Sequence, residues 1–293
     1  MPNTSFKKRF LSIQVTLSKG TFPGGDNSTV ITDLAMTAQI EKKGPPDFAS
    51  AEAVIRGLDP ETVKAMTALS MNPLKLHRNY LNIFAGDDPA NLSEVFAGTI
   101  VSAETDAAGT DRAFKISAEV GFWGRVYARG PENHAGPLSD FVKQQAQLGQ
   151  LDFVNEGVNL NLPQTTFSGS PVEKARAACE MAGADLVIDD DVMILLPKNG
   201  HRKGQISLLN AESGLLGFPS LGGDGIGVRC VYDPSLRFAG LVEIQTNVEG
   251  ASGQWRIVQL THKLAANCPD DGSWESEFTA YYPQYSDITG KII

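Results

Sequence analysis

Four histidines are the first side chains to consider for metal binding or acid–base chemistry. They lie far apart in the sequence, at His77, His134, His201 and His262. Zinc sites with paired histidines space them roughly three to five residues apart, as in HExxH, and none of the four has such a neighbour. We therefore interpret them as surface or core histidines and expect no metal-ligating residue.

Two other runs have the composition of a ligand site. Asp189, Asp190 and Asp191 are consecutive, whereas a calcium loop spaces its acids and ends in a bidentate glutamate. We interpret them as a solvated hairpin turn. The glycine-rich run at 214–228 lacks the Lys-Ser or Lys-Thr of a phosphate-binding loop, and a strand pattern follows it instead of a helix. We interpret this run as a flexible loop.

No nucleophile stands beside a base in a known motif. Ser168 and Ser170 flank a glycine in FSGSP, which is not the GxSxG elbow, and Ser170 is explained as a helix cap. The cysteines form no CxxC pair and are interpreted as small buried residues: Cys179, Cys230 and Cys268. The sequence predicts no catalytic, cofactor-binding or metal-binding residue, although two glycosidase acids that meet in space leave no sequence signature.

Composition excludes several classes of protein. The chain has 293 residues with 34 acidic and 25 basic side chains, a net charge of −9, which argues against a protein whose main task is gripping nucleic-acid phosphates. Residues 1–17 alternate instead of forming the apolar block of a signal peptide. No run approaches the roughly 20 apolar residues of a membrane-spanning helix. We expect synthesis in a cytoplasm, no stable membrane insertion, and two or three domains.

Period-two alternation predicts strands in the first part of the chain. The expected strands cover residues 11–17, 30–40, 51–58, 80–84, 95–103 and 113–120. A helix over 62–69 is predicted to start at Asp59-Pro60-Glu61, because an aspartate N-cap followed by proline suits a first helical turn. These elements indicate a barrel or sandwich.

The pattern changes between residues 126 and 205. A short helix is predicted over 139–149. Residues 170–173, SPVE, form a capping box with proline at the first helical position, and the helix is expected to end at Gly183. Residues 184–197 then predict a hairpin around the three aspartates. This part of the chain is therefore expected to be a small α+β insert.

The β pattern returns after residue 205, and it resembles the first part of the chain. The expected strands are residues 206–209, 226–232, 240–246, 254–264 and 273–282. Three segments align by eye with earlier ones: 81–83 with 242–244, 96–103 with 255–262, and 114–121 with 274–281. We predict a mainly β fold with an N-terminal β-barrel domain at 1–125, an α+β insert at 126–205 and a C-terminal β-barrel domain at 206–293.

Four segments carry a further resemblance. Residues 171–202 combine a helix, a hairpin and a polar exit, and residues 210–246 hold a glycine-proline turn, a strand ending in Tyr-Asp-Pro and a glycine before the next strand. Residues 253–283 form a closing hairpin pattern, and 95–119 form another hairpin. This order of motifs resembles the bacteriophage baseplate (tail) hub family of long-tailed phages. The motifs are structural and not catalytic.

The resemblance implies a structural subunit with two tail-tube-like β-barrels. Three copies would form a homotrimeric ring of six similar barrels, so that a three-fold hub can join a six-fold tail tube to the tail tip in the virion. The implied partners are the tail-tube or distal-tail protein, the tape-measure protein, a tail spike or fibre protein, and DNA that passes without sequence-specific binding. An acidic bore would repel DNA phosphates during genome ejection.

Two other functions stay open at this point. A tail-tip enzyme that degrades peptidoglycan or another glycan needs a cleft with two carboxylates of divergent pKa. A carbohydrate-binding β-module needs an exposed aromatic platform. The tryptophans are instead expected to pack in the core or between the barrels: Trp123, Trp255 and Trp274.

Overall fold

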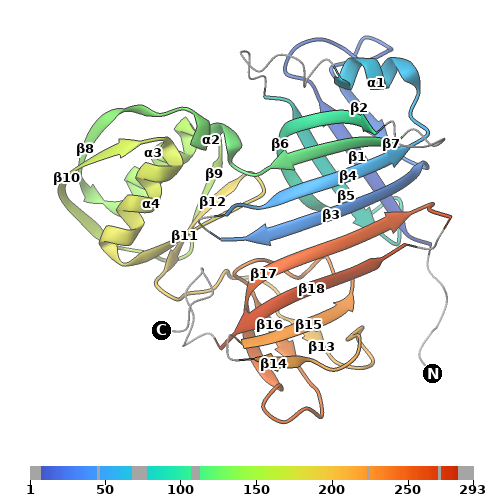
Figure 1. The fold of residues 1–293 in the computed structure, drawn as a ribbon. Coiled ribbons are helices and arrows are strands. Elements are labelled where there is room, and N and C mark those ends of the chain that lie inside the picture. Colours follow the sequence, from blue (N-terminus) through green and yellow to red (C-terminus); the bar gives the residue numbers. More distant parts are fainter. Residues whose placement is uncertain are drawn as a thin grey trace.

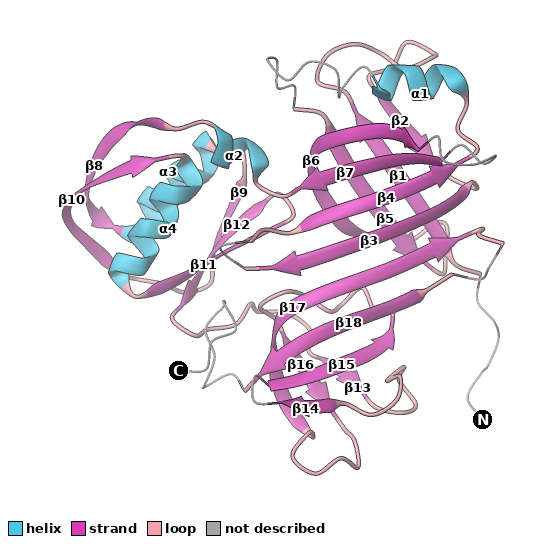
Figure 2. Ribbon diagram, viewed as in Figure 1, coloured by secondary structure: helices cyan, strands magenta, loops and turns pink. Residues whose placement is uncertain are grey.

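The structure, a computed structural model, describes residues 8–44, 47–67, 78–106, 113–222, 225–269 and 272–282. The fold is mainly β with a smaller α+β insert, as predicted (Figure 1). Thirteen strands belong to one sheet, and a two-stranded and a three-stranded sheet belong with three helices to the insert. Figure 2 shows the helices of the insert grouped to one side of the long sheet.

The predicted N-terminal strands are all present. They are β1 (Phe10–Thr16), β2 (Ser28–Ile31), β3 (Ala35–Lys43), β4 (Ser50–Arg56), β5 (Tyr80–Gly86), β6 (Ser93–Asp106) and β7 (Ala113–Glu119). The single strand expected over 30–40 is divided into β2 and β3, because Asp33 between them has φ 62°, a left-handed conformation that interrupts a strand.

Helix α1 (Pro60–Thr67) begins where the sequence predicts it. The Asp59 carboxylate accepts a hydrogen bond from the backbone N–H of Thr62 at 2.8 Å, which is the expected N-cap contact. The predicted end of this helix, residues 68 and 69, lies outside the described residues.

The insert contains the predicted helices and hairpin together with strands that the sequence analysis missed. Its elements are α2 (Phe122–Val126), β8 (Arg129–Pro137), α3 (Leu138–Leu148), β9 (Asp152–Asn155), β10 (Asn161–Gly169), α4 (Pro171–Ala182), β11 (Ala184–Asp189) and β12 (Val192–Pro197). Both hydrogen bonds of the capping box are formed between Ser170 and Glu173, and Gly183 ends α4 with φ 70°. Strand β8 was missed because its residues are mostly exposed and carry no apolar alternation.

The C-terminal strands agree with the prediction except at one place. They are β13 (Ser207–Leu209), β14 (Ser220–Gly222), β15 (Gly225–Val231), β16 (Leu241–Ile244), β17 (Gly253–Ala266) and β18 (Trp274–Tyr281). The run at 214–228 was interpreted as a flexible loop before a strand, and the structure places a further strand, β14, within it. Strand β14 pairs with β15, and the N–H of Leu216 donates to the carbonyl of Arg229 at 2.8 Å, so backbone hydrogen bonds hold this run against the sheet.

Pairing between β3 and β17 joins the two β regions into one sheet. The strand order is β14-β15-β18-β17-β3-β4-β7-β6-β5-β1-β2, and β16 and β13 branch from β17. Residues 36–43 of β3 pair with 259–266 of β17. The path therefore ends at β14 and at β2, and within the described part of the chain hydrogen bonding does not close it into a barrel. The two expected barrels are halves of one open sheet.

Strand β17 uses one edge for two partners. Arg256 pairs with both Leu241 of β16 and Tyr281 of β18, so β16 and β18 lie on opposite edges. Thr261 pairs with both β18 and β3, so these two also lie on opposite edges. Strands β16 and β3 consequently follow one another along the same edge of β17.

The internal repeat is present in the strand pairing. Strands β5, β6 and β7 form an antiparallel meander, and β16, β17 and β18 form another. In the first meander, Ile100 pairs with Ala118 and a β-bulge follows at Val101. In the second, a β-bulge at Val258 follows the pairing of residue 257 with residue 280. The common bulge fixes which residues of the two repeats are equivalent.

This equivalence corrects part of the alignment made by eye. The match of 81–83 with 242–244 is in register, since Leu81 pairs with Gly98 and Val242 with Trp255, each three residues before its bulge. The other two matches, of 96–103 with 255–262 and of 114–121 with 274–281, are each displaced by two residues from the structural equivalence. A two-residue shift keeps every side chain on the same face of a strand, so the apolar pattern did not reveal it.

The described residues form three hydrophobic clusters, and two of these include strands of the long sheet. One is shared by the N-terminal strands and the insert and contains Phe96, Phe114 and Phe141. The other belongs to the C-terminal strands and contains Trp255 and Phe278. No helix in the described residues is long and apolar enough to cross a membrane.

Candidate functional site

The opposite face of the long sheet is mostly polar from β15 to β6. Along one row, Arg229 of β15 pairs with Glu277 of β18, which pairs with Thr261 of β17, which pairs with Glu41 of β3. Parallel rows continue it across β4, β7 and β6. We call this surface the polar face: Gln39, Glu41, Lys43, Glu52, Glu104, Lys115, Ser117, Glu119, Arg229, Gln259, Thr261, Lys263, Glu275, Glu277 and Thr279.

Ion pairs occupy the C-terminal part of the polar face. The guanidinium of Arg229 lies 2.8 Å from a Glu275 oxygen and 3.2 Å from a Glu277 oxygen. The ammonium of Lys263 lies 2.8 Å from the other Glu277 oxygen. Two acids and two bases therefore neutralise one another in this region.

The N-terminal part of the polar face has the same character. Lys43 lies 3.4 Å from Glu41, and Lys115 lies 2.7 Å from Glu52. Exposed pairs of this kind contribute little to stability, so their main effect is on the surface potential. The polar face carries both signs of charge in contact with each other, instead of a continuous acidic or basic surface.

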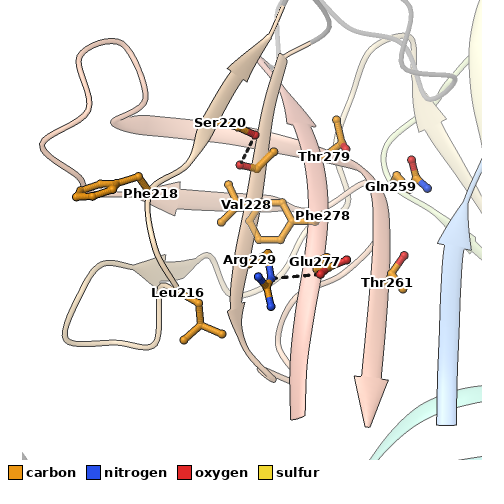
Figure 3. A pocket seen from close by; sticks show the side chains of 11 residues that line it. Leu216, Phe218, Ser220, Val228, Arg229, Gln259, Thr261, Glu277, Phe278 and Thr279 are labelled. Atoms are coloured by element: carbon orange, nitrogen blue, oxygen red, sulfur yellow. Dashed lines mark hydrogen bonds and ion pairs between the residues drawn. The ribbon is translucent and has the colours of Figure 1, made fainter. Parts of the chain in front are cut away.

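The polar face ends in a groove beside β14 (Figure 3). Side chains of β14, β15, β17 and β18 line a volume of about 420 Å³ there, and Arg229 and Glu277 are among them. Two apolar side chains stand at this edge: Phe218 is 83% exposed and Leu221 is 50% exposed. Apolar side chains are therefore exposed at this edge of the sheet.

A cluster of charged side chains is buried where the insert meets both halves of the sheet. The Lys42 ammonium of β3 lies 3.0 Å from an Asp189 oxygen and 2.9 Å from an Asp190 oxygen. Arg202 also pairs with Asp189, and the backbone N–H of Ala97 donates to Asp190 at 3.2 Å. Together with His262, these side chains form what we call the buried junction.

The buried junction corrects the interpretation of the three aspartates. They do lie at a hairpin turn, between β11 and β12, and Asp190 has φ 53°. Asp189 is not solvated, because its side chain is only 4% exposed and Lys42 and Arg202 reach it from other parts of the chain. Asp191 is the most exposed of the three and lies 4.0 Å from Arg78.

Burial and mutual charge shift the pKa values in the junction in different directions. Burial opposes ionisation of Asp189, but the charges of Lys42 and Arg202 outweigh it and hold its pKa below the usual range. Burial and the charge of Asp189 raise the pKa of Asp190 to about 6. Burial and the charge of Lys42 lower the pKa of His262 to about 3, so its imidazole is neutral near pH 7.

Two neighbouring acids of divergent pKa are also the feature that a glycan-cleaving enzyme would need. The cavity beside them is about 200 Å³, smaller than the roughly 300 Å³ at which ligand pockets begin. Asp189 and Asp190 are both held by buried cations from distant elements. The ion pairs that connect the insert to the sheet therefore explain the shifted pKa values of the two acids.

A second buried ion pair connects the insert to β17. Arg256 is fully buried, and its guanidinium lies 3.6 Å from the Asp185 carboxylate of β11. Asp185 also accepts hydrogen bonds from the Lys198 ammonium and the Asn199 N–H, each at 3.0 Å. Both halves of the sheet are thus tied to the insert by buried charge.

The other candidate residues are dispersed. His134 is half-buried on β8 with its Nε2 3.2 Å from the Pro137 carbonyl, and His201 is exposed in the segment after β12, whereas His77 lies outside the described residues. In the part of the chain that the structure describes, no group of three or more His, Cys, Asp or Glu side chains could hold a metal ion. Ser170 is the N-cap of α4, as predicted.

The cysteines and tryptophans have structural positions. None of the cysteines forms a disulfide; Cys179 and Cys230 are buried, and burial raises the pKa of each, so their thiols are not activated. Cys268 is half-buried. The tryptophans each pack against a tyrosine: Trp123 on Tyr127, Trp255 on Tyr282, and Trp274 on Tyr232.

Comparisons with solved structures find the same architecture in two tail proteins and in one complex. The tail protein from Neisseria meningitidis MC58 has a TM-score of 0.65 at 10% identity, over 92% of this chain and 96% of that one. The prophage MuSo2 43 kDa tail protein from Shewanella oneidensis has a TM-score of 0.64 at 10% identity, over 96% and 99%. The Francisella PdpA-VgrG complex, half-lidded, has a TM-score of 0.56 at 8% identity, over 96% and 59%.

At these identities the likeness shows the fold, and the family follows from a separate match. A search of curated proteins finds no match. The family model described as "Baseplate hub gp41" matches residues 11–270, which include the insert, the buried junction and all strands of the long sheet except β18. That match confirms the resemblance read from the sequence, and it shows that this chain belongs to the baseplate hub gp41 family.

Proposed function

We propose that three copies of this baseplate hub chain form a ring with pseudo-six-fold symmetry that joins the tail tube to the tail tip. Membership of the family makes the chain a structural component of the phage tail, and thus of the virion. The homotrimer and the ring are proposals beyond family membership, and they rest on the internal repeat of the chain.

The observation that carries the proposal is the repeated meander. Strands β5–β7 and β16–β18 have the same antiparallel order and a β-bulge at the same place, and β3–β17 pairing joins the two repeats in one sheet. Two equivalent units in each chain convert three-fold symmetry into six similar positions. A three-fold hub of this kind matches a six-fold tube above it.

The polar face suits the wall of a channel for passing DNA. A protein that holds DNA needs cations free to displace counterions from phosphates. On the polar face, Arg229, Lys263, Lys43 and Lys115 each contact a carboxylate. We propose that this mutual neutralisation, instead of a purely acidic bore, lets DNA move past without sticking.

The proposed surroundings follow from this role. The ring would contact the tail-tube or distal-tail protein, the end of the tape-measure protein, and a spike or fibre protein, and the chain would be synthesised in the host cytoplasm. We propose a non-enzymatic role, and domains at 1–125, 126–205 and 206–293.

The test is the mass of the purified protein by light scattering at several concentrations. Each chain is 31.4 kDa, and we expect three times that mass, either for the protein alone or after addition of tail-tube protein. A monomer that stays monomeric with those partners and clears cell-wall substrate would overturn the proposal in favour of an enzyme.

A further inference from the structure

Several strand edges of the long sheet have no partner strand among the described residues, and the repeat relates two of them to the β3–β17 contact. One is the outer edge of β14, at the end of the strand path. The other is part of β6. Thr99 pairs with both Tyr80 of β5 and Glu119 of β7, so these strands flank β6 on opposite edges, and in the described part of the chain no strand continues the β5 side beyond Thr99. Unpaired edges are templates for another strand.

The repeat identifies β14 as the equivalent of β3. Ile40 of β3 pairs with Ala51 of β4, and Leu221 of β14 pairs with Ile226 of β15. Ala51 in turn pairs with Ala118, which lies opposite Ile100, the residue before the bulge in the first repeat. Ile226 pairs with Ala280, which lies opposite Ile257, the residue before the bulge in the second repeat. Leu221 therefore stands in the second repeat where Ile40 stands in the first.

The same bulge identifies the equivalent of the β17 edge. Ile40 pairs with His262, which lies four residues after the bulge at Val258. Four residues after the bulge at Val101 is Thr105 of β6. The edge of β6 around Thr105 is thus equivalent to the part of the β17 edge that pairs with β3.

Exposure distinguishes the paired edges from the unpaired ones. Ile40 and His262 are buried where β3 and β17 meet, at 0% and 2% exposure. Leu221 is half-exposed, and Glu104 and Thr105 are exposed. Within the described residues, the chain makes the β3–β17 contact, but the equivalent edges of β14 and β6 have no partner strand.

We propose that β14 of one copy adds antiparallel to the β6 edge of a second copy, with Leu221 opposite Thr105. The inference rests on the proposed function and gives the trimer its interface. Each copy offers both edges, so the contact is head-to-tail. Around a ring of three, the internal β3–β17 contact and the β14–β6 contact would alternate, so that all six repeats meet their neighbours in the same way.

Disulfide trapping tests the predicted register. Paired residues of an antiparallel ladder bring their Cβ atoms to about 4.5–5.5 Å, close to disulfide geometry. We expect T105C/L221C, with Cys268→Ser added, to form covalent trimers on mild oxidation. A mixture of T105C and L221C single variants should give covalent dimers and nothing larger, because each chain then has one reactive edge.

The register control is E104C/L221C, in which the two side chains would project to opposite faces of the sheet. We expect at least about tenfold less covalent trimer from it than from T105C/L221C. Equal trapping by both variants would mean random collision, and would overturn the proposed pairing.

A second variant tests the edge without a cross-link. L221E places a charge against the proposed partner and should raise the concentration at which the trimer dissociates by at least about tenfold. The matched control is V30E, because Val30 is an exposed aliphatic residue on β2, the outermost strand at the other end of the same sheet. We expect V30E to leave the trimer intact.

The outcomes separate this inference from the function on which it rests. A trimeric mass that L221E does not change, with no T105C/L221C cross-link, would refute the β14–β6 contact and leave the hub trimer standing. A protein that remains monomeric with tail-tube protein and forms no cross-link would refute both. Covalent trimers from the double variant, with dimers from the mixed singles, support the contact.

Discussion

Lys42 is the residue on which the buried junction depends most directly. Along β3 the inward positions are Met36, Ala38 and Ile40, and Lys42 continues that inward phase. A lysine at an apolar position of an alternating strand is a signal that sequence analysis could have used. The residues that bind it follow more than 140 positions later in the chain, so their identity could not be predicted from the local pattern.

Replacing Lys42 should destabilise the fold strongly. Lys42→Met would leave Asp189 and Asp190 buried without their ammonium partner, and removal of one member of a buried ion pair typically costs about 3–5 kcal/mol. Lys43→Met is the control, because its pairs with Glu41 and Asp47 lie at the surface and contribute at most about 1 kcal/mol. Denaturant unfolding measures both. Equal losses would contradict the role of the junction.

His262 should make stability depend on pH. Its pKa in the folded protein is about 3, below the value near 6.5 in an unfolded chain, so the unfolded state binds more protons between these values. Stability should therefore fall as pH decreases from about 6.5 toward 3, by up to about 4 kcal/mol for this group.

His262→Gln provides the measurement. The glutamine keeps a polar partner for the Ser276 hydroxyl, which lies 2.8 Å from the imidazole, but does not titrate. The free energy of unfolding of the variant should fall less than that of the natural protein over this pH range. Asp190 has a raised pKa and acts in the opposite sense between about pH 4 and 6, but it is present in both proteins. Parallel curves would show that His262 is not the group responsible.

At the scale of the elements, the cap of α4 is a local feature that was predicted fully. Ser170 Oγ accepts from the Glu173 N–H at 3.3 Å, and the Glu173 carboxylate accepts from the Ser170 N–H at 2.8 Å. Ser170→Ala should cost about 1 kcal/mol in unfolding free energy. Ser168→Ala, at an exposed position of β10 two residues earlier, should change it by less than about 0.5 kcal/mol. A loss no larger than in Ser168→Ala would mean that the box does not stabilise the helix.

Elements were predicted where their cause is local. The helix caps and the strands with clear alternation depend on neighbouring residues. Strand β8 and strand β14 depend instead on partners, since both are largely exposed and have no apolar period of their own. The break at Asp33 was missed because a left-handed aspartate leaves no mark in the hydrophobic pattern around it.

At the scale of the whole molecule, the repeat was predictable and the way its halves join was not. The two meanders share an apolar pattern that sequence comparison can detect. The β3–β17 ladder pairs residues more than 200 positions apart, and nothing in either strand specifies that partner. Two separate barrels were therefore expected where the chain forms one open sheet, and the free edges of that sheet became visible only in three dimensions.

The charge balance of the polar face should decide whether DNA passes or is held. Glu275→Gln with Glu277→Gln would remove the carboxylates that pair Arg229 and Lys263. Two freed cations should raise affinity for double-stranded DNA by on the order of tenfold at low salt, and should steepen the salt dependence by roughly two counterions.

The matched control for that variant changes the net charge equally away from the polar face. Glu212→Gln with Glu249→Gln alters two exposed acids in loops. Filter binding of the purified proteins to the same DNA at several salt concentrations compares the two double variants. If both bind DNA equally tightly, net charge alone sets the affinity and the ion pairs have no particular role. If only E275Q/E277Q gains affinity and salt dependence, pairing on this one surface is what keeps the phosphates from binding, as a channel wall requires.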